Sequence, residues 1–432
     1  MCALTVPNDA ALPAPGGRAE QNPARIWAAV REALASLADE SPDRVSAVAC
    51  TGQMHGVMIV DERLEPVSPL VTWQDRRADT LAVEANARLD ELDGRGWIGR
   101  GCRLHPGYGG LTLAWQAREA AIPRGARWAC TISDWIAARL SGTLATDYSN
   151  AASWGLFAAG RRDWDRGAVG ALGIPLEMLP PLRESGELLG RARLGALGSE
   201  VPVACGLGDN QASVLAAISG LPPEDCCVVN VGTGAQISVV SDTPAGGVTA
   251  LEPPLEVRPF VEGKSLHVGA SLNGGAAYAV LRRFLAEAGG EHAEADDLFA
   301  AMNSWAASVP PGCDGLVCDP AFAGERGRED LTGSLSGITP RNLTPGHLCR
   351  AVLEGMARTL HRFYRSAGLP KRVLVGSGNA VRMNGLFREI LSSTFGLPLR
   401  VSEHTEEAAV GAALVAARVG ELRGRATGPG GH

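Results

Sequence analysis

The sequence predicts an α/β protein with two large domains. Its 432 residues are more than one hydrophobic core usually supports, because single cores stop growing at about 250–300 residues. Short apolar runs of strand length alternate along the chain with longer amphipathic stretches, which is the pattern of α/β architecture. Hydrophobic residues make up 45% and charged residues 20% of the chain, as in ordinary globular proteins.

The first half, placed at residues 1–215, is expected to alternate strands with helices. Residues 23–38 carry apolar side chains at helical spacing, and Pro23 suits the first turn of a helix. Residues 110–140 are also expected to be rich in helix. Strands are predicted, from short apolar runs bounded by turn residues, at 45–50, 58–61, 69–73 and 202–208.

The second half, placed at residues 216–420, is predicted to follow the same alternation. Residues 226–240 are typical of two strands joined by a glycine turn, and residues 241–259 of a turn-rich connection. Asn273 is a candidate N-cap for the helix that follows it. The tail at 421–432 is expected to be disordered. Helices are predicted at 211–220, 274–288, 348–367, around 384–396 and at 406–420, and a strand at 372–378.

Composition and charge exclude several classes of function. The net charge of −7 gives no basic surface for nucleic acid, and no apolar run is long enough to cross a membrane. The N-terminal segment lacks the basic and apolar regions of a signal peptide. The ten cysteines form no CxxC pair and no zinc-spaced cluster, so we expect buried, reduced thiols. These features predict a cytoplasmic protein without a metal-ligating cluster.

Asp209 is the first candidate for chemistry. It stands in GLGDNQASV, directly after a predicted strand and before a predicted helix. An Asp at the start of a helix is a favoured N-cap, which would explain the residue without any catalytic role. A carboxylate is also the group that accepts the proton when a hydroxyl attacks a phosphoryl group. The residues alone leave both interpretations open.

Two glycine turns are candidates for contact with phosphate. The sequence GTG at 232–234 separates two predicted strands, and the backbone amides of such a turn can surround phosphate oxygens. The sequence GSGN at 376–379 follows a strand, where nucleotide loops lie in α/β sheets. Neither turn matches the dinucleotide or P-loop fingerprint. Taken alone, a plain hairpin and a plain strand-to-helix turn are the simpler explanations.

Two polar segments in the first half are candidates for sugar binding. GQMHG at 52–56 supplies Gln and His side chains, which can hydrogen-bond to hydroxyl groups. WQDRR at 73–77 combines an aromatic ring with carboxylate and guanidinium groups. The alternatives are a loop histidine with a structural partner and a surface ion pair of little consequence.

Taken together and in order, these segments resemble the FGGY carbohydrate kinases of the actin/hexokinase superfamily. The similarity extends from about Gly17 to about Gly420. NAASWG at 150–155, EVRPF at 256–260 and ASLNGG at 270–275 are more similar to the sedoheptulokinase branch than to the xylulokinase branch. The ordered segments are SAVACTGQMHG, LVTWQDRR, TDYSNAASWGLF, PVACGLGDNQAS, VVNVGTGAQIS, PAFAGERG, VLVGSGNA and EEAAVGAALVA.

This resemblance implies two RNase H-like lobes around a central cleft, with the sugar against the first lobe and ATP with Mg²⁺ against the second. Asp209 would be the catalytic base. The implied reaction is phosphorylation of a ketose by ATP, with sedoheptulose as the first choice and xylulose or another sugar of the family as the alternative. The enzyme would act as a monomer or homodimer. The sugar would lie near Met54, His55, Asp75 and Asn210, and the nucleotide near Gly232, Thr233, Gly275, Gly376, Gly378 and Asn379.

The sequence departs from the family at its start. Members open with a strand–turn–strand motif of the type DxGTTxxK, which contacts the ATP phosphates, and no such motif precedes Gly17. We therefore expect a first lobe that is incomplete at its N-terminus and has an unpaired strand edge. A start codon placed too far downstream is the explanation we favour, because Asp209 and both glycine turns are present. A kinase relic that only binds sugar or nucleotide is the alternative, and an actin-like or chaperone ATPase is a third interpretation that GQMHG and WQDRR disfavour.

Overall fold

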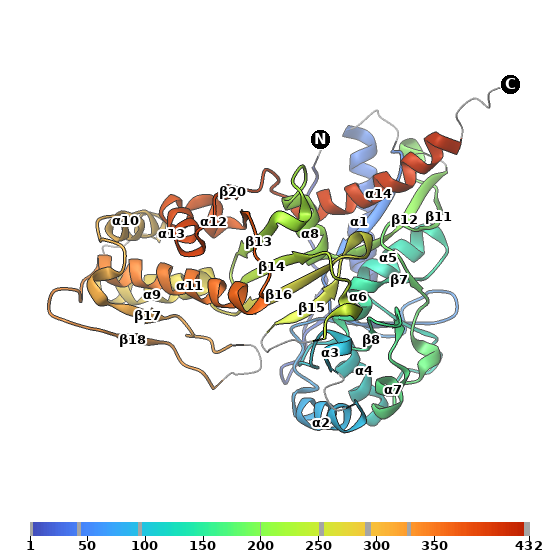
Figure 1. The fold of residues 1–432 in the computed structure, drawn as a ribbon. Helices are drawn as coiled ribbons and strands as arrows, with labels where there is room; N and C mark the ends of the chain where they lie inside the picture. The colour runs from blue at the N-terminus through green and yellow to red at the C-terminus, as the bar shows by residue number, and fades with distance from the viewer. Residues whose placement is uncertain are drawn as a thin grey trace.

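Two lobes lie side by side in the computed structural model, which describes residues 3–40, 45–93, 97–198, 200–249, 255–289, 295–325 and 330–426. In Figure 1 the first half of the chain, blue to green, forms the lobe on the right, and the second half, yellow to red, forms the lobe on the left. Helix α14 (Glu407–Ala426) returns from the second half to the first. It packs there against helix α8 (Asp209–Ala217) and strands β3 (Val48–Gly52) and β12 (Val201–Gly208).

A six-stranded sheet forms the centre of the second half, in the order β15-β16-β14-β13-β19-β20. Strands β13, β19 and β20 are parallel, whereas β15, β16, β14 and β13 form antiparallel pairs. The run CCVVNV in β13 sends alternate side chains to opposite faces. Cys227 and Val229 face the core under α9, α11 and α13, and Cys226 and Val228 face the core under α8 and α14. The strands are β13 (Cys226–Val231), β14 (Ala235–Ser241), β15 (Glu256–Pro259), β16 (Ser265–Ser271), β19 (Val373–Ser377) and β20 (Leu399–Val401).

Helix α11 (Pro345–Ala367) is the longest helix that covers this sheet, and it confirms the helix predicted at 348–367. The Thr344 side chain caps its start by accepting a hydrogen bond from the His347 amide, and Gly368 ends it with a φ of 64°. A two-stranded arm leads into this helix. The other elements here are α9 (Gly275–Gly289), α10 (Ala295–Ala307), α12 (Asn379–Met383), α13 (Gly385–Phe395), β17 (Val317–Asp319) and β18 (Ser334–Ser336).

The first half contains a three-stranded sheet in the order β11-β12-β3, in which β12 and β3 run parallel. Strand β12 is buried at all eight positions, because α5 covers one face of the sheet while α8 and α14 cover the other. Strand β3 lies at the edge of this sheet and is only half-buried. Both β12 and β3 therefore end beside the start of α8, where Asp209 stands.

The rest of the first half consists of short strands and helices around two further hydrophobic cores. Helix α1 (Pro23–Glu40) confirms the helix predicted at 23–38. The remaining helices are α2 (Ala82–Asp93), α3 (Trp97–Arg100), α4 (Gly109–Arg118), α5 (Ile132–Ser141), α6 (Tyr148–Ser153) and α7 (Arg166–Ala171). The remaining strands are β1 (Ala11–Leu12), β2 (Glu20–Gln21), β4 (Met58–Val60), β5 (Leu70–Val71), β6 (Trp128–Cys130), β7 (Thr146–Asp147), β8 (Phe157–Ala158), β9 (Asp163–Trp164), β10 (Leu182–Arg183) and β11 (Leu188–Ala192).

The structure differs from the sequence predictions at four places. Strand β6 interrupts the stretch expected to be rich in helix, and β15 lies in the stretch expected to be a connection. Asn273 does not cap α9. Its side chain instead bonds Ala323 and Gly324. Helix α14 continues to Ala426, past the predicted end at 420, while residues 427–432 of the predicted disordered tail lie outside the described residues.

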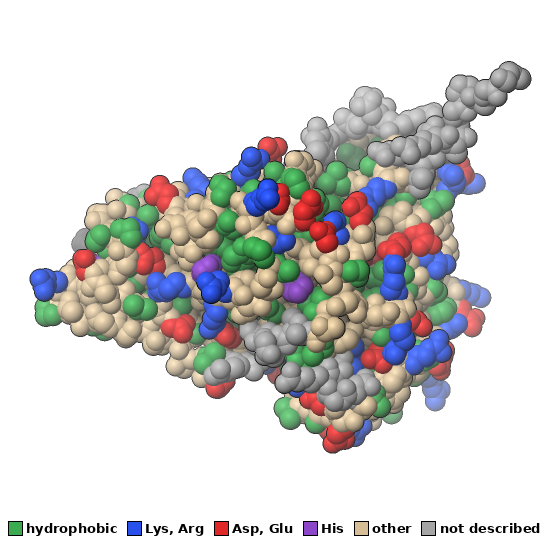
Figure 2. All heavy atoms as spheres, in the orientation of Figure 1, with side chains coloured by type: hydrophobic (Ala, Val, Ile, Leu, Met, Phe, Trp, Pro, Cys, Tyr) green, Lys and Arg blue, Asp and Glu red, His purple; other side chains and the backbone are tan. Residues whose placement is uncertain are grey.

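The charged side chains and the cysteines are distributed as the composition predicts. Figure 2 shows basic and acidic side chains interspersed over the face that it displays. Nine cysteines fall in the described ranges, and eight of them are buried. Over the same ranges, no helix has the length and apolar character needed to cross a membrane.

Candidate active site

A cleft of about 690 Å³ lies where the two lobes meet. Three of the four predicted sugar-site residues line it, Met54, His55 and Asn210, together with Asp209, the predicted base. The second half supplies the facing wall through β14, β15, β16 and α11. The other lining residues that carry polar or aromatic groups are Trp73, Trp97, Arg103, His105, Gln236, Glu256, Arg258, Glu325, Arg362, Phe363 and Ser366.

Asp209 is the first residue of α8, so the N-cap position belongs to Gly208. Strand β12 delivers this turn, and two contacts from the first half hold it. The Gly208 amide donates to Ser149 Oγ at 2.9 Å, and that hydroxyl donates to Asp147 Oδ2 at 2.6 Å. A side chain at Gly208 would displace Met54, because its Cβ would lie 2.5 Å from Met54 Sδ. The 52–56 loop therefore packs directly against the residue that precedes the base.

The electrostatic environment of Asp209 suits a base that works near neutral pH. Burial raises the pKa of this half-buried carboxyl to about 6, although a hydrogen bond from the Asn210 amide at 2.7 Å and the Arg258 cation oppose the rise. The carboxylate is thus ionised at pH 7 and yet more basic than an exposed Asp, the combination that general-base catalysis requires. The N-cap interpretation does not describe this residue.

His55 is held rigidly on the first-lobe wall of the cleft. Its backbone has a φ of 71°, a conformation that residues other than glycine seldom adopt. Its amide donates to Ser153 Oγ at 3.1 Å, and its Nδ1 lies 2.7 Å from the Ser153 carbonyl oxygen. The imidazole stacks on Tyr108 with 4.2 Å between ring centres. A histidine fixed in this way can present one ring nitrogen to the cleft in a constant direction.

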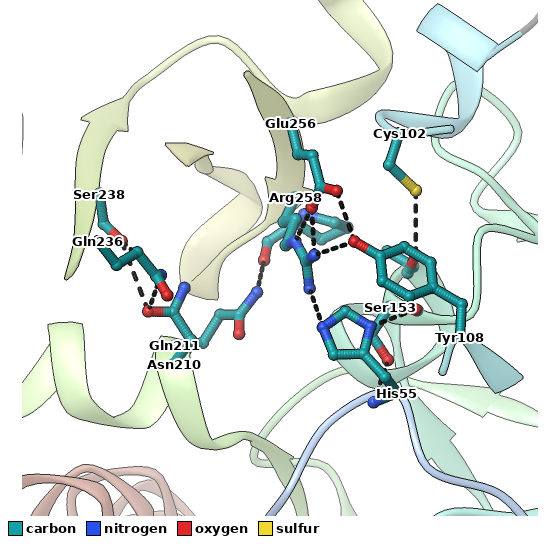
Figure 3. A network of polar contacts seen from close by, with 12 residues as sticks. His55, Cys102, Tyr108, Ser153, Asn210, Gln211, Gln236, Ser238, Glu256 and Arg258 are labelled. Carbon is teal, nitrogen blue, oxygen red and sulfur yellow. Dashed lines mark hydrogen bonds and ion pairs between the residues drawn. The ribbon is translucent and has the colours of Figure 1, made fainter. Parts of the chain in front are cut away.

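Glu256 and Arg258 on β15 bring a buried ion pair to the opposite wall. Figure 3 shows Arg258 between Glu256, the Tyr108 hydroxyl and His55. The sequence interpretation missed both residues as site candidates, because 241–259 was expected to be a connection. The signal was present in EVRPF, where two charged residues alternate with apolar ones in the period of a strand.

Asp75 does not lie on the cleft, which corrects its sequence-based placement beside the sugar. The residue is 2% exposed, and its carboxylate accepts hydrogen bonds from the Ala19 amide at 2.7 Å and from Arg77 Nε at 2.8 Å. Burial opposes ionisation, yet the bonds from Arg77 and the amides hold its pKa below the usual value. Asp75 therefore fixes the 73–77 loop, whereas Trp73 of the same segment is the residue that lines the cleft.

The predicted nucleotide residues come together at the carboxyl ends of β13 and β19, which are neighbours in the sheet. The Gly275 amide donates to the Gly232 carbonyl at 2.7 Å, joining the start of α9 to the 232–234 bend. Gly378 packs so closely on β13 that a Cβ there would lie 2.6 Å from Asn230 Oδ1. Gly376 and Asn379 flank it, in β19 and at the start of α12.

A hydrogen bond joins β14, which follows the 232–234 bend, to α8, which begins with the base. Gln236 lies two residues beyond the bend, and its Nε2 donates to Asn210 Oδ1 at 2.6 Å. Asn210 follows Asp209 directly in α8. Thr233 is exposed on the bend that precedes β14.

Comparison with known proteins assigns the family. Residues 3–216 match the N-terminal domain of the FGGY family of carbohydrate kinases, and residues 227–419 match its C-terminal domain. Together these matches take in both lobes and the cleft between them. The chain therefore belongs to the FGGY family of carbohydrate kinases, which are phosphotransferases that act on sugars.

Individual relatives differ in the substrate that they are named for. Sedoheptulokinase from Homo sapiens is 30% identical and covers 95% of this chain and 88% of its own length. Glycerol kinase from Thermus brockianus is also 30% identical and covers 92% of this chain and 81% of its own. The crystal structure of xylulose kinase from Rhodospirillum rubrum is similar with a TM-score of 0.81, 26% identity, and coverage of 95% and 84%.

Proposed function

We propose that this chain transfers the γ-phosphoryl group of ATP to a ketose, with sedoheptulose as the substrate and sedoheptulose 7-phosphate as the product. The observation that carries the proposal is the Asp209 carboxyl, with its pKa of about 6, on the wall of a cleft large enough for a sugar. The similarity to human sedoheptulokinase over nearly the whole chain supports this choice of sugar.

In the proposed mechanism Asp209 accepts the proton of the attacking sugar hydroxyl. The O–H bond breaks, an O–P bond forms to the γ-phosphorus, and the bond between that phosphorus and ADP breaks. Asp209 also orients the hydroxyl, because a carboxylate accepts the hydrogen bond along one direction before it accepts the proton. Met54 and His55 shape the first-lobe wall, and Asn210 joins α8 to β14 by its hydrogen bond with Gln236.

The nucleotide is proposed to bind against the glycine bends of the second lobe. The bend at 232–234 is exposed, and a Cβ at Gly232 would meet nothing within 4 Å, so space for phosphate oxygens lies open there. Helix α9 begins beside this bend, and helix N-termini favour anions. Within the described ranges no group of three His, Cys, Asp or Glu side chains is placed to hold a metal ion. Mg²⁺ is accordingly proposed to bind through the ATP phosphates, as it does in many kinases.

The charges of the cleft favour a neutral sugar over a sugar acid. Three arginines line the cleft, and each already has a carboxylate partner. A substrate carboxylate would have to break one of these pairs, whereas sugar hydroxyls can hydrogen-bond to the pairs as they stand. A ketose therefore fits these walls better than an aldonate. The pairs are Arg103–Asp90, Arg258–Glu256 and Arg362–Glu325.

The test is ATP consumption with a panel of sedoheptulose, xylulose, gluconate and glycerol. We expect the highest kcat/KM with sedoheptulose and the lowest with gluconate. Asp209→Asn should abolish transfer while ATP still raises the melting temperature. A higher kcat/KM for xylulose would reassign the sugar, and binding of sugar or ATP without any turnover would favour the relic alternative.

A further inference from the structure

Two charged side chains on β15, Glu256 and Arg258, have so far been considered only as an ion pair on the cleft wall. They stand two residues apart on one strand, so both project from the same face, toward the cleft. Both are almost fully buried, with 7% and 5% of their surface exposed. A buried ion pair adds little net stability compared with apolar side chains of the same size. Its presence at the cleft therefore calls for an explanation other than stability.

Arg258 connects the second lobe to two side chains of the first. Its Nε lies 3.1 Å from Glu256 Oε2, and its Nη2 lies 3.3 Å from the Tyr108 hydroxyl. Tyr108 also bonds Glu256 directly, so these three groups close a ring of contacts. Nη1, on the other arm of the guanidinium, points to His55 Nε2 at 3.5 Å. We call His55, Tyr108, Glu256 and Arg258 the interlobe latch.

The direction of these bonds fixes the tautomer of His55. The Ser153 carbonyl oxygen beside Nδ1 can only accept, so Nδ1 carries the proton. In the neutral imidazole, Nε2 then has a lone pair and accepts from Arg258 Nη1. Arg258 thus donates a hydrogen bond to His55 Nε2, while the imidazole ring stacks on Tyr108.

Arg258 is also the cation whose charge acts on Asp209. Glu256 shares this cation, which reduces but does not remove its effect on the base. Helix α14, packed on α8, adds Glu407, whose carboxylate is engaged by Ser377 and Arg382. The other charged or titratable side chains on the described cleft wall are His55, Arg103, His105, Glu256, Glu325 and Arg362.

We propose that Arg258 is a positioning residue that joins the two lobes at the sugar site and couples the orientation of His55 to the charge beside Asp209. The inference rests on the proposed kinase function. It follows from the geometry that the guanidinium reaches His55 and Tyr108 only while β15 lies against the first lobe. Opening of the cleft would separate the latch, and closure around a sugar would restore it together with the charge beside the base.

The fork of the guanidinium is essential to this role. Lysine has a single ammonium group, which can keep the charge near Asp209 but cannot span Glu256, Tyr108 and His55 at once. Methionine fills a similar volume and removes both the charge and the fork. Arg258→Lys and Arg258→Met therefore separate the two parts of the proposal.

The experiment measures sugar affinity by calorimetry without ATP, and the pH profile of kcat/KM, for the full chain and its variants. Both variants should bind sedoheptulose about tenfold to a hundredfold more weakly, the effect expected when charged hydrogen bonds are lost. In Arg258→Met the acid limb of the profile should also move to higher pH, because no cation opposes protonation of Asp209. In Arg258→Lys the limb should stay close to that of the wild type.

Two further variants distinguish a change of charge at the cleft from a general loss of stability. Glu256→Gln leaves Arg258 without its counter-charge, so the acid limb should move to lower pH, opposite to Arg258→Met. Arg350→Met removes a buried arginine of the same lobe whose partner Glu354 lies 2.9 Å away and which does not line the cleft. It should lower the melting temperature and leave the acid limb in place.

The outcomes separate this inference from the proposed function. A wild-type chain that phosphorylates no sugar overturns the proposed function and the inference with it. An active wild type whose acid limb and sugar affinity are unchanged in Arg258→Met overturns the inference alone. A limb that moves equally in Arg258→Met and Arg350→Met would show a general effect of destabilisation, and the positioning role would be rejected.

Discussion

The pH dependence of kcat/KM should report the ionisation of Asp209. Its carboxyl accepts the substrate proton only when it is ionised, and burial raises its pKa to about 6. Because the pKa is raised, the active form is lost as the pH falls through 6 rather than through the ordinary value of 3.8. The acid limb of the profile should therefore lie about two pH units above that of an exposed Asp.

The size of the effect follows from the two pKa values. With a pKa of 6 the ionised fraction falls from about 90% at pH 7 to about 10% at pH 5, so kcat/KM should fall about tenfold. With the ordinary pKa the ionised fraction would still be above about 90% at pH 5, and kcat/KM would hardly change. The two cases are easily distinguished with one sugar and saturating ATP.

The assay is the initial rate of ADP release at low sugar concentration between pH 5 and pH 8. A matched control is Asp134→Asn, because Asp134 is another buried carboxyl with a raised pKa that does not line the cleft. Its acid limb should coincide with that of the wild type, while Asp209→Asn should show no measurable limb because turnover is lost. A profile that stays flat down to pH 5 would refute Asp209 as the desolvated base.

Three other changes have defined outcomes. Ser149→Ala removes the acceptor of the Gly208 amide and should lower the free energy of unfolding by about 1–3 kcal/mol, as chemical denaturation would show. In steady-state kinetics the same variant should change kcat, which should fall, more than KM. Thr233→Val should raise the KM for ATP several-fold and leave the KM for sugar and the melting temperature unchanged, because this exposed side chain is proposed to touch only phosphate. Burial raises the pKa of Asp134 to about 7, so its protonated form stabilises the fold below pH 3.8 and this contribution is lost as the pH rises to 7. Asp134→Asn should consequently gain about 2–3 kcal/mol relative to the wild type between pH 5 and pH 8, as urea unfolding at both pH values would measure.

Local patterns were sufficient wherever a segment's environment follows from its own residues. The run CCVVNV is apolar on both faces, and such a run is typical of a strand covered on both sides, as β13 is. The helix predicted at 348–367 has one apolar face and a glycine just after its end, and the structure confirms it. Strand β15 escaped prediction because two of its three buried positions are occupied by Glu256 and Arg258, residue types that a composition argument assigns to the surface.

The sequence by itself determined the two-lobed α/β class, the family and the candidate base at position 209. Only the tertiary structure decided which polar residues face the cleft. Asp75 and Trp73 are two positions apart, yet the Asp75 carboxylate accepts hydrogen bonds from Arg77 and Ala19 while the Trp73 indole lines the cleft. The physical reason is that periodicity and turn chemistry depend on neighbours in the chain, whereas burial, charge pairing and the pKa of a carboxyl depend on groups brought near from distant segments.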